Sequence, residues 1–206
     1  EPIGTAPLVE IARGRSDACI VVSDITRPVP NAVIVPPILE ALTGAGLPPE
    51  RVTILIGTGL HRPASPEEIR ELLGDEVTET GCAVINHVAI NDDEQAHLGE
   101  TGRGAPALVD RRYVEADLRI LTGLVEPHLM AGYSGGRKAI CPGVAGRDTI
   151  MALHAPALLE PAEARAGNLI ANPVHEEALA VADLAGGADF IVNVTLDERR
   201  ALTGVF

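Results

Sequence analysis

The sequence predicts an α/β fold: a mainly parallel sheet with helices on both faces, in a Rossmann-like three-layer arrangement. Three observations favour it. Short apolar runs alternate with stretches of helical pattern along the 206 residues. Hydrophobic residues make up 46% of the chain and aromatic residues only 2%, so the core must consist of Val, Ile, Leu and Ala. The 21 glycines and 16 prolines suit tight connections between elements. We expect one domain over residues 1–206.

Five apolar runs predict the strands of this sheet. They are apolar throughout instead of alternating with polar residues, which is typical of parallel strands covered on both faces. The runs are Ala18–Val22, Val52–Ile56, Cys82–Ile85, Leu118–Leu121 and Phe190–Val194.

The first predicted helix follows the first strand. Pro36 and Pro37 are expected to open it, because proline is favoured in the first turn of a helix. The helix then runs through Ile38–Leu42 and ends near Gly44 or Gly46.

Two later helices have clear start signals. The segment Ser65–Glu68 combines a capping serine, a proline in the first turn and a glutamate three residues on, which predicts a helix to about Gly74. Asn172, followed by proline, begins another helix that Gly186 should end. The polar, glycine-containing segment Asn91–Arg103 is expected to be an exposed loop.

Charge and cysteine usage exclude several classes of partner. The formal net charge of −13 argues against nucleic acid and anionic membranes, which select basic surfaces. No apolar run approaches the length of a membrane span. Cys19, Cys82 and Cys141 form no CxxC pair and are interpreted as small hydrophobic residues in a reducing compartment. A cytoplasmic location is therefore expected.

Ionisable residues gather directly after the predicted strands. Asp24 and Arg27 follow the first strand, and His61 lies in a glycine-containing segment after the second. His128 follows the strand near residue 120, with the glycine-rich segment Gly132–Lys138 just beyond it. Ligands bind outside the carboxyl ends of the strands in sheets of this class. We therefore expect these residues at one rim of the sheet.

The glycine-rich segment Gly132–Lys138 leaves two interpretations open. Its backbone N–H groups, with donors from Ser134 and Arg137, could hold an anion, or the segment is a tight turn before a helix. It is not a Walker A loop, because Ala139 follows the lysine where a hydroxyl would hold Mg²⁺. Lys138 is the only lysine beside 15 arginines. An amine can lose its proton and form an amide-type bond, which a guanidinium cannot.

The histidines and the Asp24–Arg27 pair can also be interpreted as purely structural. His61 and His128 are either structural residues or a pair that moves a proton from opposite sides of a substrate. Asp24 and Arg27 either cap a turn together or use the arginine to hold a carboxylate. His154 ends a predicted short helix, and no HExxH or Cys/His cluster predicts a zinc site made by protein ligands alone. Three further histidines are interpreted as structural or solvated: His87, His97 and His175.

Taken together, these segments resemble the nickel-pincer lactate racemase family. The matching segments, in chain order, are Asp24–Pro30, Gly57–Pro63, Glu126–His128 running into Gly132–Lys138, and Pro142-Gly143 leading to His154. A weaker match at Asn172–His175 and the last strand extends the resemblance toward the end of the chain.

The resemblance implies a cofactor and a mechanism. Enzymes of this family carry a nickel-pincer nucleotide (pyridinium-3-thioamide-5-thiocarboxylate mononucleotide) on a lysine that matches Lys138. Nickel is held by a carbon and two sulfurs of the cofactor and by a histidine that matches His154. His61 and His128 match an acid/base pair: one removes the hydroxyl proton of a 2-hydroxy acid while the α-hydrogen passes as hydride to the cofactor. The planar keto acid then takes the hydride back on either face.

The remaining site residues follow from the same resemblance. Asp24 and Arg27 match positions near the substrate, where Arg27 would hold the substrate carboxylate. Ser134 and the neighbouring Gly135 and Gly136 are expected to hold the cofactor phosphate, and Arg137 is expected to be a further cofactor-binding residue. The implied activity is an isomerase, a racemase or epimerase of a lactate-like 2-hydroxy acid. Its implied partners are that small molecule and the proteins that make and load the cofactor.

Enzymes of this family are about twice as long as this chain and have a second domain that closes over the cofactor. We therefore expect this chain to be the cofactor-carrying N-terminal domain, and to racemise poorly by itself because closure excludes water and completes a site. Two alternatives remain at this stage: an α/β module that binds a nucleotide or phosphate, and a diverged family member without cofactor chemistry.

Overall fold

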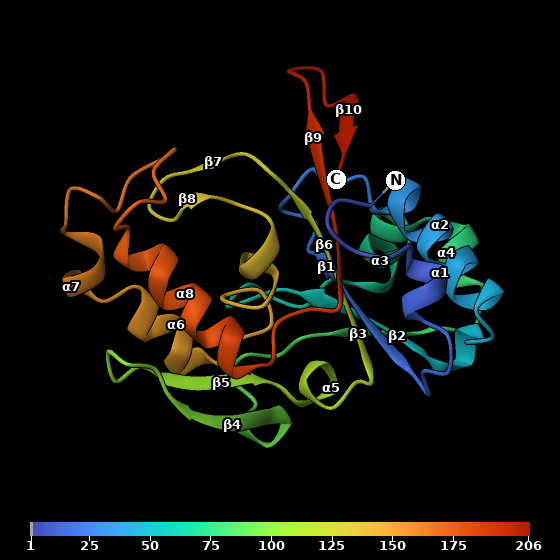
Figure 1. Ribbon diagram of the computed structural model, residues 1–206, viewed down its shortest axis with the longest axis horizontal. Coiled ribbons are helices and arrows are strands. Elements are labelled where there is room, and N and C mark those ends of the chain that lie inside the picture. Colours follow the sequence, from blue (N-terminus) through green and yellow to red (C-terminus); the bar gives the residue numbers. More distant parts are fainter. Residues whose placement is uncertain (1) are drawn as a thin grey trace.

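The computed structural model describes residues 2–206, which form a central six-stranded sheet with helices on both faces (Figure 1). Neighbouring strands are parallel except for the last, which is antiparallel to its partner. In their order across the sheet the strands are β10 (Leu202–Val205), β9 (Phe190–Leu196), β6 (Leu118–Leu124), β1 (Ala18–Ser23), β2 (Val52–Gly57) and β3 (Ala83–Asn86). The predicted α/β class and all five predicted strands are confirmed.

The order of the strands creates a switch point between β1 and β6. From β1 the chain adds β2 and then β3 on one side, and it later returns to add β6 and β9 on the other side. Connections therefore leave the carboxyl ends of β1 and β6 in opposite directions, which opens a crevice between them. Loops after β1, β2 and β6 all begin at this edge.

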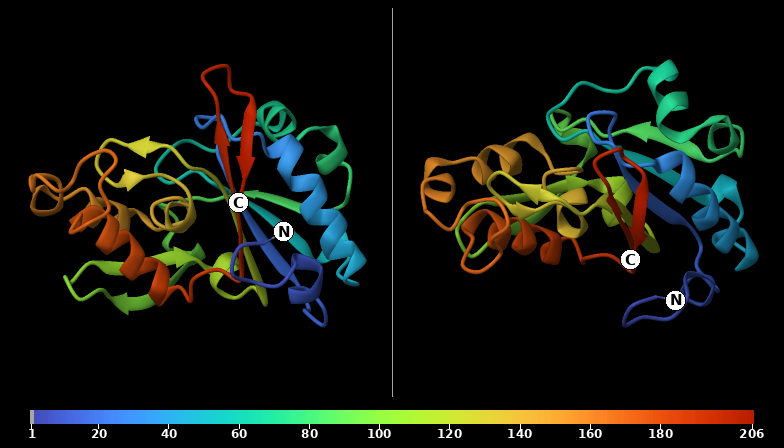
Figure 2. Two further views of the ribbon diagram at one scale, coloured as in Figure 1. Left: turned by 45° about the horizontal axis from the view of Figure 1, so that its top comes forward. Right: turned by 90° about the horizontal axis from the view of Figure 1, so that it is seen from above.

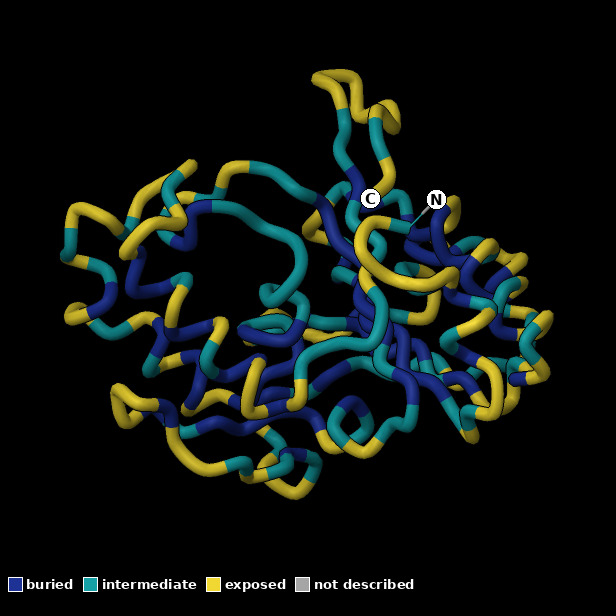
Figure 3. Tube along the Cα trace, in the orientation of Figure 1, coloured by how far each residue is buried: buried dark blue, intermediate teal, exposed yellow. Residues whose placement is uncertain are grey.

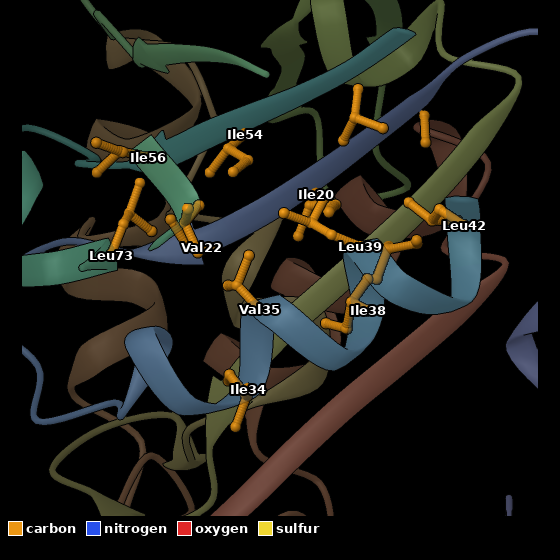
Figure 4. Packing of buried hydrophobic residues seen from close by; sticks show 14 of the residues in the cluster. Ile20, Val22, Ile34, Val35, Ile38, Leu39, Leu42, Ile54, Ile56 and Leu73 are labelled. Atoms are coloured by element: carbon orange, nitrogen blue, oxygen red, sulfur yellow. The ribbon is translucent and has the colours of Figure 1, made fainter. Parts of the chain in front are cut away.

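One face of the sheet is covered by the first helices of the chain (Figures 1 and 2). Figure 4 shows apolar side chains of these helices packed against the strands: Val35 and Leu39 face Ile20 and Ile54. Burying a side chain of this kind contributes about 1.5–3 kcal/mol. The elements on this face are α1 (Leu8–Ile11), α2 (Asn31–Gly44), the 3₁₀ turn η1 (Pro49–Arg51), α3 (Pro66–Leu73) and α4 (Asp75–Thr78).

The start of α2 differs from the prediction. Pro36 and Pro37 lie inside the helix, which begins at Asn31, and they do not open it. The additional turn presents Ile34 and Val35 to the sheet, where both are buried. The apolar contact of that turn outweighs the backbone hydrogen bonds that the two prolines cannot donate.

The other two predicted helices are confirmed at their start signals. In α3 the hydroxyl of Ser65 accepts a hydrogen bond from the N–H of Glu68, and the Glu68 carboxylate accepts one from the N–H of Ser65. The helix α8 (Pro173–Leu184) begins after Asn172, whose side-chain oxygen accepts hydrogen bonds from the N–H groups of Val174 and His175.

The second face of the sheet carries a small antiparallel pair and the later helices (Figure 1). Its elements are η2 (Asp92–Glu94), β4 (Gln95–Glu100), β5 (Pro106–Asp110), α5 (Arg111–Val114), β7 (Pro127–His128), β8 (Gly132–Tyr133), η3 (Gly136–Ala139), α6 (Arg147–Leu153) and α7 (Pro156–Leu159), together with α8. Buried side chains of this face form a second core, which includes Val21, Leu55, Leu121 and Val181.

The expectation that Asn91–Arg103 is an exposed loop is wrong. It contains η2 and β4, and β4 pairs with β5 from Gln95 opposite Asp110 to Glu100 opposite Pro106. The local sequence is polar, but β5 supplies an apolar partner from outside the segment. Burial follows the layers: the inner strands β1, β2 and β6 are mostly dark in Figure 3, while the turn between β9 and β10 is exposed. No helix within residues 2–206 has both the length and the apolar character that a membrane crossing requires.

Candidate active site

A cavity of about 340 Å³ lies at the switch point, at the carboxyl edge of the sheet. Its volume falls within the range of small-molecule sites. Eight of the ten predicted site residues line it: Asp24, Arg27, His61, His128, Ser134, Gly135, Lys138 and His154. Gly136 and Arg137 are not among the lining residues.

The imidazole of His61 is held by a buried carboxylate. Its Nδ1 lies 2.7 Å from Oδ2 of Asp24, while the other oxygen of Asp24 accepts a hydrogen bond of 2.6 Å from the hydroxyl of Thr26. A carboxylate can only accept, so Nδ1 carries the proton and the Nε2 of a neutral His61 has a free lone pair. The His61 side chain is 58% exposed, whereas Asp24 is buried. Asp24 thus contacts the histidine, and any contact with substrate stays a prediction.

His128 is held in the opposite way. The N–H of Ala131 donates a hydrogen bond of 3.2 Å to its Nδ1, so a neutral ring carries its proton on Nε2. Burial lowers the pKa of His128 to about 4, and the cations of Lys138, Arg27 and Arg137 and the ring of His154 act in the same direction. The half-buried His128 is therefore neutral at physiological pH.

Lys138 lies on η3 with its side chain at the cavity wall. Burial lowers its pKa to about 8, helped by the positive charges of Arg27 and Arg137. About a tenth of such amines are neutral at pH 7, compared with fewer than one in a thousand for an ordinary lysine. Only the neutral amine is a nucleophile, so this environment favours covalent attachment.

His154 is the C-cap residue of α6. Its Nδ1 lies 2.7 Å from the carbonyl oxygen of Ile150, so the proton is on Nδ1. The lone pair of Nε2 is then free to bind a metal. Metal-bound histidines commonly make such a hydrogen bond through the nitrogen that does not bind the metal. Among residues 2–206, no three His, Cys, Asp or Glu side chains gather closely enough to hold a metal ion. Any metal at His154 needs other ligands.

The residues predicted to hold the cofactor phosphate, Ser134, Gly135 and Gly136, already make contacts within the protein. The hydroxyl of Ser134 donates to the carbonyl of Leu124 at 2.6 Å, and the N–H of Gly136 donates to Oδ1 of Asn193 at 3.3 Å. Gly135 has a φ of 80°, and a Cβ there would lie 2.9 Å from the same Asn193 oxygen. These contacts explain the glycine by packing, and the role of the segment in phosphate binding stays a prediction.

Arg137 does not line the cavity, and its guanidinium binds backbone. Its Nη2 donates to the carbonyl oxygens of Ala131 at 2.7 Å and Tyr133 at 3.3 Å. Asn172, which the sequence indicated only as a helix start, also donates to the carbonyl of Met130 at 2.9 Å. Both side chains thus hold the β7–β8 hairpin that carries His128. No sequence signal indicates these contacts, because the residues meet only in the folded chain.

Arg27 stands at the mouth of the cavity. Its side chain is 43% exposed and lies 3.5 Å from the carboxylate of Glu126, which also lines the cavity. At this distance and exposure the pair contributes little to stability. The guanidinium is thus available for an anionic group of a ligand.

A buried histidine–carboxylate pair lies next to the site. His87 follows β3 and is fully buried, with Nδ1 2.9 Å from Oδ2 of Asp110 and Nε2 2.9 Å from the carbonyl of Ala145. Its own carbonyl accepts a hydrogen bond of 2.7 Å from the hydroxyl of Thr58, which lines the cavity near His61. The structural role expected for His87 agrees with these contacts.

Comparison with known proteins agrees with this geometry. The family described as the lactate racemase N-terminal domain matches residues 1–167. A lactate racemase of Lactiplantibacillus plantarum is 38% identical over 205 residues, and one of Thermoanaerobacterium thermosaccharolyticum is 35% identical. Each comparison covers 100% of this chain and 48% or 47% of the relative. The chain therefore spans about half the length of these relatives.

Two solved structures share the fold. The lactate racemase apoprotein from Thermoanaerobacterium thermosaccharolyticum superposes with a TM-score of 0.94 at 34% identity, covering 100% of this chain and 48% of that one. A protein from Thermotoga maritima gives a TM-score of 0.78 at 23% identity, covering 97% and 51%, and shows the fold alone. By the family match over most of its length, the chain belongs to the lactate racemase N-terminal domain family.

Proposed function

We propose that this chain is the cofactor-carrying part of a racemase for a small 2-hydroxy acid, with lactate as the first substrate to test. The observation that carries the proposal is the meeting of three different groups at one cavity. They are an amine of lowered pKa (Lys138), a histidine with a free Nε2 (His154) and a carboxylate-held histidine (His61). A module that only binds phosphate needs none of the three.

The residues fit a nickel-pincer nucleotide attached to Lys138. The amine of Lys138 would bond covalently to it, and Nε2 of His154 would complete the coordination of the nickel. Most metal ligands would then come from the cofactor, which suits a cavity without a cluster of protein ligands in residues 2–206. When bound, the group supplies an acceptor for the α-hydrogen of the substrate.

The chain's own residues hold the substrate and move its hydroxyl proton. Arg27 binds the carboxylate at the cavity mouth. Nε2 of His61 accepts the hydroxyl proton, while Asp24 holds the imidazole and stabilises its positive charge. His128 is the second member of the acid/base pair and serves the opposite enantiomer. Return of the proton and the α-hydrogen to the planar keto acid from the other face yields the mirror-image product.

Phosphate binding without further chemistry is supported less well. Such a module would need donors for the anion, but neither an amine of lowered pKa nor a histidine with a free Nε2.

The test is covalent loading. The chain is co-expressed with cofactor-making proteins and nickel, and its intact mass and bound nickel are measured beside those of Lys138→Arg. The arginine keeps the positive charge but cannot form the bond. We expect a nucleotide-sized adduct with nickel only on the lysine chain. A lysine chain without adduct, from cells that load a known lactate racemase, would contradict the proposal.

A further inference from the structure

We propose that Arg137 is a positioning residue for His128: by clamping the β7–β8 hairpin, it holds the ring as the neutral Nε2–H tautomer. The sequence alone indicated Arg137 as a cofactor-binding residue. The inference rests on the proposed function only for the part that His128 plays in turnover.

The first step is the direction of the Arg137 side chain. Arg137 does not line the cavity, and its Nη2 donates hydrogen bonds to the carbonyls of Ala131 and Tyr133. These carbonyls belong to the end of the β7–β8 turn and to β8 itself. A planar guanidinium that binds two carbonyls of one short segment fixes the orientation of the peptide groups in it.

The second step is the peptide group of Ala131. Its carbonyl accepts from Arg137 at 2.7 Å, and its N–H donates to Nδ1 of His128 at 3.2 Å. The same residue therefore links the guanidinium to the imidazole. The antiparallel pairing of His128 with Gly132 keeps the histidine beside this N–H.

The third step is the second anchor of the hairpin. Asn172 is fully buried, and its amide donates to the carbonyl of Met130 at 2.9 Å while its oxygen caps α8. Successive carbonyls, of Met130 and Ala131, are thus held by two different side chains. The turn cannot rotate its Ala131 N–H away from His128 without breaking one of these bonds.

The consequence is a difference between the two histidines. Asp24 leaves Nε2 of His61 ready to accept a proton, whereas the clamp leaves Nε2–H of His128 as a donor. To accept the hydroxyl proton at Nε2, His128 must first carry its own proton on Nδ1, which requires release of the Ala131 N–H. The clamp therefore makes this acid/base step conditional on movement of the turn. The lowered pKa of His128 agrees with a ring held neutral. The charged and titratable groups that lower it, Lys138, Arg27, Arg137 and His154, are all basic, and the carboxylate of Glu126 lines the same cavity.

The test reads the ring directly, in the chain without cofactor. Histidine is labelled with ¹⁵N, and the ring nitrogens of His128 are assigned and classified by NMR in the wild type, Arg137→Met and the control Arg27→Gln. We expect the Nε2–H tautomer in the wild type. In Arg137→Met the ratio of Nε2–H to Nδ1–H should fall by up to about tenfold, the effect of losing one hydrogen bond. Arg27→Gln removes a facing charge but leaves the clamp, so the tautomer should not change.

Two further measurements keep the result interpretable. If circular dichroism shows that Arg137→Met does not fold, Arg137→Gln replaces it, because the shorter amide side chain keeps a polar group at this position but cannot reach the place of Nη2 between the two carbonyls. A folded Arg137 variant with the wild-type tautomer would overturn the proposal. After co-expression with cofactor-making proteins, Arg137→Met should still gain the adduct on Lys138. Loss of the adduct with an unchanged tautomer would instead make Arg137 a cofactor ligand. The NMR result stands even if the wild-type chain takes up no adduct.

Discussion

On one face of the central sheet, α1–α4 pack through apolar side chains, whereas the face with β4, β5, α6 and α8 encloses charged and amide groups. The buried polar side chains of the second face and its loops include His87, Gln95, Thr101, Asp110, Thr149, Asn172 and Glu177. Apolar contacts have no direction and set the shape of a layer. Hydrogen bonds have direction, so the second face can fix how its loops point into the site.

This difference predicts different mutational effects. On the apolar face, a truncated side chain should lower stability and leave the site groups unchanged. On the polar face, loss of one partner should lower stability and also disturb Lys138, His61 or His128. Because Lys138 is the only lysine, its reaction with an acylating reagent, mapped by peptide mass spectrometry, reports on the site in any variant.

The largest effect is expected for Asp110→Ala. It leaves the buried His87 without its carboxylate and leaves Arg112 with Glu94 as its remaining one, and breaking a buried pair costs about 3–5 kcal/mol. Urea unfolding measures the loss, with Asp110→Asn as the matched control that keeps the shape and one acceptor. Lys138 should also acylate at a changed rate. His87 binds the carbonyl of Ala145, which lies in the segment that follows Lys138, so loss of the pair should let this segment shift. A loss below about 1 kcal/mol would show that the pair is not important to the fold.

Leu42→Ala tests the apolar face. Leu42 is fully buried in α2, and truncating such a leucine costs about 2–5 kcal/mol because it leaves a cavity. Urea unfolding should show this loss, while the acylation rate of Lys138 at low urea stays at the wild-type value. A changed rate would mean that packing on this face reaches the site, and the comparison between the faces would fail.

A smaller effect is expected for Asp24→Asn in a complete racemase. One way to obtain it is to join this chain to the remaining part of the Thermoanaerobacterium thermosaccharolyticum enzyme. The amide no longer stabilises the charge that His61 acquires, so turnover should fall roughly 10- to 100-fold. The control is the intact mass, which should show the same adduct on Lys138 as in the wild type. If turnover is unchanged, His61 does not act as the base.

The smallest effect concerns the pH dependence of Lys138. Acylation needs the neutral amine, so its rate should rise with pH, reach half its maximum near pH 8 and then level off. Arg27→Gln removes one facing cation and should move this midpoint slightly upward, because a like charge disfavours the protonated amine. A wild-type midpoint near that of an ordinary lysine would show that the side chain is solvated.

Much of the scaffold could be predicted from the sequence because its signals are local. Continuous apolar runs indicated the strands, and the capping box at Ser65 indicated α3. Local sequence signals gave wrong predictions where residues far away in the chain determine the structure. β4 depends on pairing with β5, and the first turns of α2 depend on burying Ile34 and Val35 against the sheet.

The candidate site likewise has features that could be predicted from the sequence and features that could not. Its loops could be placed at one edge because parallel strands bring their carboxyl ends together. The partners that orient the side chains could not be predicted. His87 meets Asp110 across 23 positions and the carbonyl of Ala145 across 58, and the direction of Arg137 follows from a hairpin that has no pattern of its own.

The switch point between β1 and β6 also bears on the order of assembly. The crevice exists because two crossovers diverge from neighbouring strands, so no ligand has to hold it open. With His61 exposed at its mouth and Lys138 at its wall, the folded chain offers its amine to an incoming group from outside. Under the proposed function, folding can therefore precede modification of Lys138, and a loading protein would need to recognise a folded surface instead of an unfolded chain.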